Sequence, residues 1–464
     1  MESFGTQGIV VYDTECYPNL YLLCVGDPLS RKALVFEISD RRDDRESMFS
    51  LLRGFYKNRT RMVGYNNLRY DYVLLDYILK NKKADNDKIF KFSSDLIKRE
   101  DQKFVKHMIP QIDLFEIHHF SNRARMTSLK VLEFNMQMDN IEDLPFPPGS
   151  VLSHDQIDEL RRYVKHDVKA TADFLKASEP QLAFRRDLSR KYGRNFMNFN
   201  DVRIGKEIFI DALEKAGVRI RDDNGNLRQT PREKIIVKDI LLPYLKFNHP
   251  ELQRVHEEFK NLIIVNTKGD LKISADLDGF QLDYGTGGLH GSVTDTLVTS
   301  DDEYCIRADD CASMYPNLAI KNRFYPEHLT EKFCDVYDQM FQERKKHKKG
   351  SVENAAYKLA LNGSYGQSNS EYSPFYDPQF TMSITIAGQL VMSMLVERLM
   401  AVPTVEMIFC NTDGVCYKVK RDMLHEVDKV CREWENLTKL ELETEYYKRM
   451  YIRDVNSFVL SYED

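Results

Sequence analysis

The chain has 464 residues, of which 42% are apolar and 11% aromatic, which is enough for well-packed cores and too long for one ordinary domain. Charged residues make up 30% of the sequence, which excludes a low-complexity chain, and the formal net charge of −6 excludes an overall basic character. The negative net charge is still compatible with a nucleic-acid-binding protein, because phosphate contacts can be local.

The cysteines and the apolar stretches indicate the cellular compartment in which we expect the chain. None of the eight cysteines forms a Cys-x-x-Cys pair or a Cys/His spacing typical of structural zinc, so we expect reduced thiols in a cytoplasmic compartment. Residues 1–15 contain no basic region followed by a long apolar run, so no secretory signal is predicted. The apolar stretch 382–400 is interrupted by polar and charged residues and predicts a buried helix rather than a membrane span.

The first part of the chain mixes strand and helix patterns. Residues 8–39 predict paired strands, and helical patterns follow over 45–55 and from Asp71 onward. Residues 153–176 carry apolar side chains at three- and four-residue spacing, which predicts a long helix. This mixture is typical of an α/β nuclease-like domain that ends near residue 180.

The second part of the chain predicts a sheet with several helices. In chain order we expect charged and largely helical residues over 180–270 with a loop at 222–226, a glycine-rich break at 284–288, and strands around 292–310. Helices over 335–400 and a hairpin over 404–420 that turns at residues 411–414 follow.

Acidic residues recur in three segments of the first part. Asp13 and Glu15 lie two residues apart on a predicted strand, so their side chains share a face. Two such carboxylates repel unless a cation lies between them, which suits Mg²⁺ or Mn²⁺, although a solvated strand end is the commoner reason for the pair. Asp71 follows in a second segment. Tyr163 and Asp167 share a face of a predicted helix, where an ordinary amphipathic helix is the alternative.

These three segments, in this order, resemble the exonuclease motifs of the DEDD nuclease family, in its tyrosine-bearing branch. The resemblance implies a ribonuclease-H-like 3′→5′ exonuclease domain in which two metal ions are held by four acids, Asp13, Glu15, Asp71 and Asp167. It also implies that Tyr163 orients a water molecule and that Asn67 contacts single-stranded DNA.

A strand-like segment in the second part runs into residues 310–316, which read DCASMYP. This segment differs only at Met314 from D-x-x-S-L-Y-P, motif A of the family B DNA polymerases. The resemblance implies that Asp310 and the Cys311 carbonyl bind a metal ion. It also implies that Tyr315 excludes a ribose 2′-hydroxyl from the nucleotide site, for which a core aromatic role is the alternative.

A basic run at 344–349 precedes a second helical segment. Such runs are usually solvated helix faces, but residues 358–366 resemble motif B, K-x-x-x-N-S-x-Y-G, with Gly363 in place of serine. Two helices with a short turn resemble the helical-hairpin fingers of the family. The resemblance implies dNTP binding, with Arg344, Lys348 and Lys358 on the triphosphate and with Asn362 and Tyr365 lining the pocket of the nascent base pair.

The segment Asn411-Thr412-Asp413-Gly414 resembles motif C, whose usual core is D-T-D-S. Asp413 matches the second acid of this core, and the second acid is the one most directly associated with the metal ions in the family. Asn411 removes one negative charge beside the ions, and Gly414 replaces the serine. A hairpin turn without a catalytic role is the alternative, because Asp-Gly is a strong turn signal.

Two further segments fit the same family. Residues 284–288 resemble a glycine-rich loop that touches the template strand, and residues 447–451 resemble the K-x-Y segment that supports the primer terminus. The residues implied in DNA binding are Tyr284, Gly287 and Gly288 in the loop, and Tyr451 with either Lys448 or Arg449 in the second segment.

The order of the segments predicts an α/β and α+β multidomain chain. The expected parts are an exonuclease domain over 1–180, a connecting region and the first part of the palm over 181–329, fingers over 330–366, and the rest of the palm, with its antiparallel sheet, over 367–464. Family B chains continue into a thumb, whereas this chain stops 13 residues after Tyr451. Two explanations stay open: the chain is truncated, or a second polypeptide supplies the thumb.

The resemblance as a whole implies template-directed DNA synthesis with proofreading, in phage or viral replication and in the cytoplasm of a host cell. The implied cofactors are two Mg²⁺ or Mn²⁺ ions per active site. The implied partners are primer–template DNA, single-stranded DNA, dNTPs and a thumb-bearing polypeptide or processivity factor, without a membrane. Two alternatives stay open: a 3′→5′ exonuclease whose polymerase half only binds DNA or needs a second polypeptide, and a non-catalytic replisome subunit.

Overall fold

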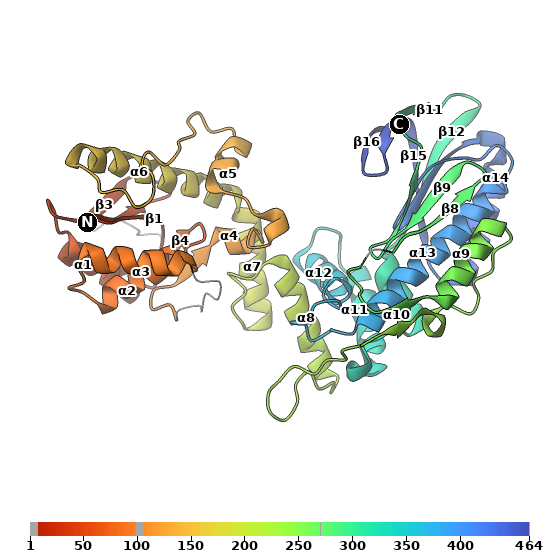
Figure 1. Ribbon diagram of the computed structural model, residues 1–464, viewed down its shortest axis with the longest axis horizontal. Helices are drawn as coiled ribbons and strands as arrows, with labels where there is room; N and C mark the ends of the chain where they lie inside the picture. Colours follow the sequence, from red (N-terminus) through yellow and green to blue (C-terminus); the bar gives the residue numbers. More distant parts are fainter. Residues whose placement is uncertain (1–7, 99–105, 270, 464) are drawn as a thin grey trace. The chain divides into compact units, whose positions relative to one another are not determined.

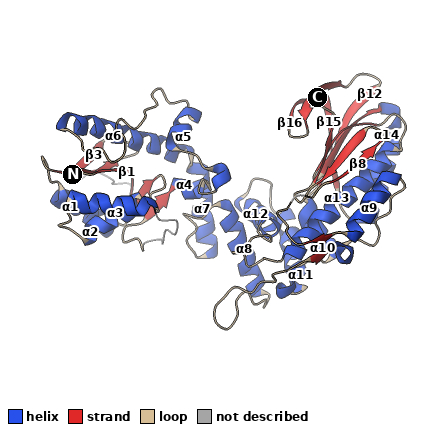
Figure 2. Cartoon of the chain, in the orientation of Figure 1, coloured by secondary structure: helices blue, strands red, loops and turns tan. Residues whose placement is uncertain are grey.

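The computed structural model describes residues 8–98, 106–269 and 271–463 (Figures 1 and 2). Residues 1–7, on which the expectation about a secretory signal partly rests, lie outside this range. The chain divides into two compact units, Met1–Ile204 and Gly205–Asp464, and each is described by itself. The finer division into four domains stays a prediction.

Unit 1 is built on a five-stranded mixed sheet with the strand order β3-β2-β1-β4-β5. The first three strands form an antiparallel meander, which confirms the paired strands predicted over 8–39, and the last two run parallel to β1. Every residue of β2 is buried, because apolar cores form on both faces of the sheet. The strands are β1 (Ile9–Tyr17), β2 (Leu20–Gly26), β3 (Ala33–Ser39), β4 (Arg61–Gly64) and β5 (Gln111–Asp113).

Helices cover both faces of this sheet (Figure 1). One core takes Val10 and Tyr12 from β1, and the other takes Val11 together with Val164 and Val168 of α6. Asp13 and Glu15 follow the alternation of Val11, so they face α6. The helices of this unit are α1 (Arg45–Asn58), α2 (Asp71–Lys80), α3 (Asn86–Lys98), α4 (Leu114–Ile117), α5 (Leu129–Asn135), α6 (His154–Ala177), α7 (Glu179–Tyr192), the first residues of α8 (Asp201–Lys215) and a 3-10 turn, η1 (Arg123–Arg125).

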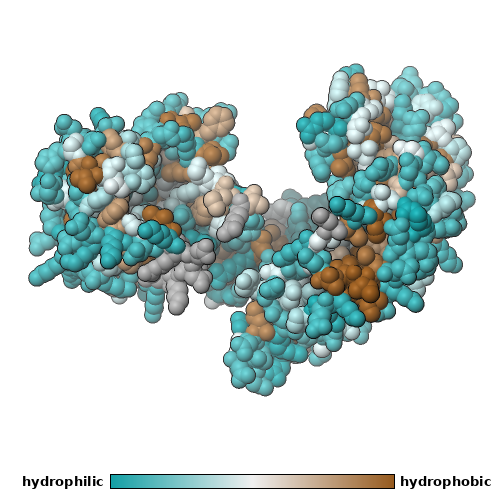
Figure 3. All heavy atoms as spheres, viewed as in Figure 1, coloured by the Kyte–Doolittle hydropathy of each residue, from teal (hydrophilic) through white to brown (hydrophobic). Residues whose placement is uncertain are grey.

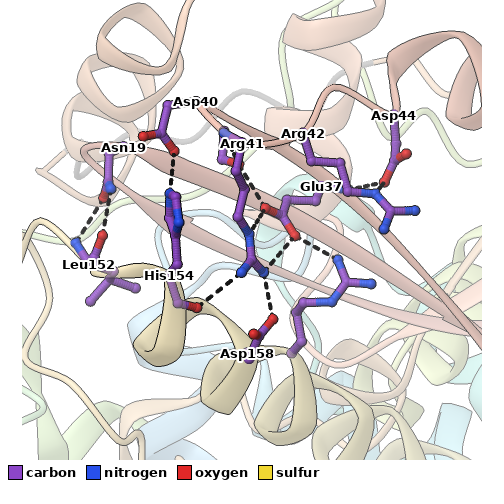
Figure 4. Close-up of polar contacts among 11 residues, drawn as sticks. Asn19, Glu37, Asp40, Arg41, Arg42, Asp44, Leu152, His154 and Asp158 are labelled. Atoms are coloured by element: carbon purple, nitrogen blue, oxygen red, sulfur yellow. Dashed lines mark hydrogen bonds and ion pairs between the residues drawn. The ribbon is translucent and has the colours of Figure 1, made fainter.

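The long helix α6 confirms the helix predicted over 153–176. Two devices hold it in place. Ser153 and Gln156 form a capping box at its first turn, so backbone donors at the helix start are satisfied. Figure 4 shows the second device, in which Arg41 bonds both to the buried Glu37 on β3 at 2.8 Å and to Asp158 on α6 at 2.6 Å. The helix that carries Asp167 is therefore held against the sheet edge.

Unit 2 contains a nine-stranded antiparallel sheet with the order β11-β15-β12-β14-β13-β10-β9-β8, in which β16 pairs with β15. The sheet brings together strands that are more than 100 residues apart, such as β12 and β14. The strands are β8 (Ile273–Leu277), β9 (Phe280–Tyr284), β10 (Leu289–Ser292), β11 (Thr296–Thr299), β12 (Tyr304–Cys311), β13 (Glu406–Asn411), β14 (Gly414–Lys420), β15 (Leu442–Asp454) and β16 (Ser457–Tyr462), with a separate pair β6 (Ile235–Ile236) and β7 (Ile263–Ile264).

Helices α9, α13 and α14 lie along one face of this sheet (Figure 1). The predictions of helices over 335–400 and of a hairpin over 404–420 are confirmed. The loop predicted at 222–226 is present, with Gly225 at a positive φ. The prediction of largely helical structure over the rest of 180–270 is partly wrong, because residues 216–221 and 227–249 form turns, single bridges and short elements. The elements are α9 (Pro250–Asn261), α10 (Met314–Asn322), α11 (Lys332–Lys345), α12 (Val352–Gly366), α13 (Pro378–Met400), α14 (Leu424–Thr438), η2 (Val237–Ile240), η3 (Glu327–Leu329) and η4 (Arg421–Met423).

The helix α13 has the length and apolar composition of a membrane span, and among the described residues no other helix does. Within its most apolar window, however, 94% of the residues are buried inside the protein. This burial confirms the buried helix predicted over 382–400. By contrast, the molecular face drawn in Figure 3 is largely hydrophilic.

Candidate active sites

An acidic cluster lies between β1 and α6 in unit 1. Asp13 and Glu15 project from β1, Asp167 projects from α6, and the carboxylate oxygens of these three residues lie within 4.8 Å of one another. Asp71, the first residue of α2, accepts a hydrogen bond from Thr14 Oγ1 at 2.5 Å. The structure thus brings together the four acids that the sequence marks in three separate segments.

Burial raises the pKa of all four carboxyl groups. The pKa is about 8 for Glu15, about 7 for Asp167 and about 6 for Asp71, and that of Asp13 lies well above its usual range. Burial is the largest cause in each case, and repulsion from the other carboxylates adds to it for Asp13 and Glu15. A divalent cation would relieve this repulsion, so the donor set fits Mg²⁺ or Mn²⁺.

Tyr163 lies one helical turn before Asp167 and is hydrogen-bonded to it. Burial raises the pKa of the Tyr163 hydroxyl, and the charge of Asp167 raises it further, so the hydroxyl keeps its proton and donates a hydrogen bond to the carboxylate. The side chain lies at the edge of the acidic cluster, where the sequence places it.

Asn67 does not face this cluster, which corrects the expectation of a direct DNA contact. The side chain is completely buried. In the orientation that satisfies both ends of the amide, its nitrogen donates to the carbonyl groups of Ile112 and Gly64, and its oxygen accepts from the Tyr12 hydroxyl at 3.1 Å. Asn67 therefore ties the segment before α2 to the sheet.

Two residues beside the cluster were not singled out from the sequence. Glu133 on α5 is buried, and its Oε2 lies 3.1 Å from His166 Nε2, next to Asp167. Glu133, His166 and Asp167 together offer three ligand atoms within 4.8 Å of one another. The sequence pattern does not predict that Glu133 lies beside the acidic cluster, because α5 and α6 meet only in the folded chain.

A pocket of about 550 Å³ opens in unit 2 beside the turn between β13 and β14. Residues from all three predicted polymerase motifs meet there, together with one acid from β15. The lining residues are Ala312, Ser313, Met314, Tyr315, Pro316, Arg344, Lys349, Lys358, Asn362, Tyr365, Asp413 and Glu443.

Asp310 lies at the end of β12, opposite Gly414 in the pairing with β14. The Cys311 amide donates to the Asp413 carbonyl at 2.7 Å, which holds the turn against β12. A Cβ atom at Gly414 would lie 1.8 Å from Asp310 Oδ1, so the Asp310 carboxylate occupies the space that a side chain would need there. Burial raises the pKa of Asp310 to about 6, and repulsion by Asp413 adds to it. These oxygen donors also fit a divalent cation.

One side of the pocket is formed by α11 and α12. Lys358, Asn362 and Tyr365 project from one face of α12, as their spacing predicts, and Arg344 projects from the last turn of α11. The ring of Tyr365 stacks on that of Tyr315 at a centroid distance of 4.2 Å, and its hydroxyl lies 2.8 Å from Thr385 Oγ1. Tyr315 is therefore held as a wall of the pocket.

Lys349, rather than Lys348, lines the pocket, which corrects one predicted triphosphate contact. The helix α11 ends at Lys345, and residues 346–350 form a turn. Lys348 therefore lies beyond the end of the helix that carries Arg344.

No protein-family model and no curated protein matches this chain. Its structure is similar to that of the family B DNA polymerase from the hyperthermophilic archaeon Pyrobaculum calidifontis, with a TM-score of 0.52 and 16% sequence identity. This likeness shows that the two chains share a fold over the aligned residues. The alignment covers 98% of this chain and 59% of the archaeal one, so this chain spans well under two thirds of that polymerase.

The glycine-rich loop expected from the polymerase resemblance packs against the motif C turn. A Cβ atom at Gly288 would lie 2.5 Å from Thr412 Oγ1, so only glycine fits at this approach. Gly287 is exposed, whereas Tyr284 is buried, with its hydroxyl 2.8 Å from Ser393 Oγ. The predicted template contact of Tyr284 is therefore corrected to a packing role, and the predicted contact of Gly287 with DNA stays a prediction.

The predicted primer segment of the polymerase lies on β15. Arg449 and Tyr451 are two residues apart on this strand and share a face, and both are exposed. Lys448 is also exposed but lies at a register shift between Tyr447 and Arg449 in the pairing with β16. The geometry therefore groups Arg449, and not Lys448, with Tyr451.

Proposed function

We propose that this chain catalyses template-directed DNA synthesis on a primer 3′-hydroxyl and removes misincorporated nucleotides with a 3′→5′ exonuclease. One observation carries the proposal. A single pocket joins Asp413 with three cationic side chains, Arg344, Lys349 and Lys358, on a fold similar to that of a family B DNA polymerase. Carboxylates beside fixed cations suit a site that handles divalent ions and a polyphosphate together.

In the proposed synthesis reaction, the three cations bind the triphosphate of the incoming dNTP by charge-assisted hydrogen bonds. Tyr315, stacked on Tyr365, lies against the sugar and excludes a 2′-hydroxyl. Asp310 and Asp413 would hold two Mg²⁺ or Mn²⁺ ions. When bound, such ions lower the pKa of the attacking hydroxyl and stabilise the charge of the leaving group.

In the proposed exonuclease reaction, Asp13, Glu15, Asp71 and Asp167 would hold two Mg²⁺ or Mn²⁺ ions in unit 1. Tyr163 keeps its proton beside Asp167 and orients the attacking water. The raised pKa values of the acids support this role, because they describe a site that is electrostatically incomplete without cations.

The test is a primer–template assay in Mg²⁺, with and without dNTPs. Extension with dNTPs and 3′ degradation without them are expected. Asp413→Ala should abolish only the extension and Asp13→Ala only the degradation. Loss of both activities in either variant would contradict the assignment of one reaction to each site.

A second candidate function is an exonuclease whose polymerase half only binds DNA or needs a second polypeptide. Asn411 favours it, because its side-chain oxygen accepts the Thr412 amide at 2.8 Å and contributes no charge to the cation site. Degradation both with and without dNTPs would support this candidate.

The biological setting is proposed on the same resemblance. We expect a place in phage or viral replication in the host cytoplasm, with a thumb-bearing polypeptide or processivity factor as partner. Tight and processive extension of a long template by this chain alone would contradict the need for that partner.

A further inference from the structure

A second set of ligand side chains adjoins the acidic cluster of unit 1. Glu133 from α5 and His166 and Asp167 from α6 offer three ligand atoms that lie within 4.8 Å of one another. Asp167 also belongs to the set with Asp13 and Glu15. Asp167 therefore joins two sets of possible ligands, and the set with Glu133 is the one that contains an imidazole nitrogen.

The imidazole of His166 is held between two carboxylates. Its Nε2 lies 3.1 Å from Glu133 Oε2, and its Nδ1 lies 4.0 Å from Glu142 Oε1 in the loop between α5 and α6. In a tetrahedral Zn²⁺ site with bonds of about 2.0–2.1 Å, two ligand atoms are roughly 3.3 Å apart, so Nε2 and Oε2 are spaced to share one ion. A carboxylate at the other ring nitrogen, as Glu142 is here, commonly orients a metal-bound histidine.

Burial distinguishes this set from an ordinary group of surface charges. The side chains of Glu133 and His166 are 2% and 10% exposed, whereas that of Glu142 is 38% exposed. Buried charges in proteins are paired with other charges or coordinate metal ions. The inner ligands are thus shielded from water, and Glu142 is the member of the group that solvent reaches.

A hydrogen bond that only ties α5 to α6 is the simpler role for Glu133 and His166. That role accounts for the 3.1 Å contact but not for the further negative charges beside the same ring. Burial is the largest cause of the raised pKa of Asp167, and the charges of Glu133 and Glu142 raise it further. Three carboxylates beside one imidazole carry more negative charge than a protonated histidine can balance, so a divalent cation would complete the set.

We propose that Glu133, His166 and Asp167 bind a transition-metal ion of the Zn²⁺ type, and that the bound ion inhibits the exonuclease. An imidazole nitrogen with carboxylate oxygens suits Zn²⁺, whereas Mg²⁺ prefers oxygen ligands alone, so the two sets that share Asp167 select different ions. Zinc draws the Asp167 carboxylate toward α5 and withdraws it from the ions of the degradation reaction. The inhibitory role rests on the proposed exonuclease function, whereas the binding of zinc does not.

The test measures Zn²⁺ binding to the full chain in excess Mg²⁺, by competition with a chromogenic chelator. Glu133→Gln should weaken Zn²⁺ binding at least about 10-fold. Glu142→Gln removes the charge beside the His166 ring and should weaken binding about 10-fold; its side chain is partly exposed, so this variant keeps the test decisive if the buried substitution disturbs folding. The matched control is Glu159→Gln, an exposed glutamate on α6, which should leave Zn²⁺ affinity unchanged.

Asp13→Ala separates the two sets of ligands. Asp13 lies in the set with Glu15, so this variant should change Zn²⁺ affinity by less than about 3-fold. An equal loss of affinity in Asp13→Ala and Glu133→Gln would place zinc among the four acids and overturn the proposal. Unchanged affinity in both Glu133→Gln and Glu142→Gln would overturn it as well.

Degradation of single-stranded DNA in Mg²⁺ with increasing Zn²⁺ then tests the inhibition. Zn²⁺ should stop degradation at the concentrations that fill the site, and Glu142→Gln should require about 10-fold more Zn²⁺ for the same effect. Continued degradation with the site filled would overturn the inhibitory role. If Zn²⁺ binds with the expected pattern among the variants but Mg²⁺ alone supports no degradation, the exonuclease function fails while the zinc site stands.

Discussion

The two candidate active sites differ in how they balance charge. The site in unit 1 is a cluster of carboxylates with raised pKa values, and none of its four acids forms an ion pair with a Lys or Arg in the part of the chain that the structure describes. The site in unit 2 combines Asp413 with three cations in one open pocket. A site that binds only metal ions with an already negative strand can be purely acidic. A site that binds a triphosphate needs fixed cations as well.

The largest expected effect separates the two sites outright. Asp413→Ala should lower primer extension by at least about 10²–10³-fold and leave 3′ degradation intact, because the two clusters lie in different compact units. Asp13→Ala should do the reverse. The measurement is gel-resolved extension and degradation on one labelled primer. Parallel loss of both activities would show that the sites are coupled.

The cations of unit 2 provide the next largest effect. Lys358→Ala should cost about 2–4 kcal/mol in kcat/KM for dNTPs, because it removes a positive charge from the triphosphate side of the pocket. Lys349→Ala should also raise the KM, whereas Lys348→Ala should change it less than about 3-fold, since Lys348 does not line the pocket. Steady-state single-nucleotide incorporation measures all three. A larger effect at Lys348 than at Lys349 would restore the triphosphate contact that the resemblance implies for Lys348.

A moderate effect is expected at the tyrosine wall. Tyr315→Ala should reduce discrimination against ribonucleotides roughly 10- to 100-fold, because it opens space beside the sugar. The matched control is Tyr365→Phe, which keeps the stacked ring and removes only the hydroxyl near Thr385. The ratio of kcat/KM for dNTP and rNTP is the measurement, and an unchanged ratio in Tyr315→Ala would make Tyr315 a packing residue only.

The smallest effect concerns the pH dependence of unit 1. Its acids have pKa values of about 6 to 8 in the folded chain, above those of an unfolded chain, so the folded state binds more protons between about pH 4 and pH 8. Without divalent cations, the free energy of unfolding should therefore fall as pH rises through this window.

Thermal unfolding in a chelator checks this expectation. Asp167→Asn, which removes one of the repelling charges, should raise the Tm at pH 8 by about 2–4 °C, the shift that about 1 kcal/mol causes in a unit of this size. Added Mn²⁺ should stabilise the unsubstituted chain more at pH 8 than at pH 5. A stability that rises with pH in the chelator would mean that the four acids are not brought together.

The sequence predicts most of the local structure around both sites. The spacing of Lys358, Asn362 and Tyr365 places them on one helix face, and the alternation of Asp13 and Glu15 places them on one strand face, as the structure has them. These relations depend only on the period of a regular element. The contact that the resemblance implies for Lys348 has no such basis in a regular element, because α11 ends at Lys345.

Long-range pairing explains what the sequence does not predict. Glu443 meets Asp310 only because β15 pairs with β12, and Glu133 meets His166 only because α5 packs on α6. Asn67 and Tyr284 sit at positions where a motif suggests contact with DNA, yet each is enclosed by neighbours from distant segments. Burial of this kind is a property of the packed chain and has no local signal.

Gly414 and Asp310 share one small space at the end of β12. Since the Asp310 carboxylate fills the place where a side chain at 414 would start, a serine at 414 requires that carboxylate to move. The two positions are therefore sterically linked, and the effect of Gly414→Ser depends on which other rotamers the Asp310 side chain can adopt.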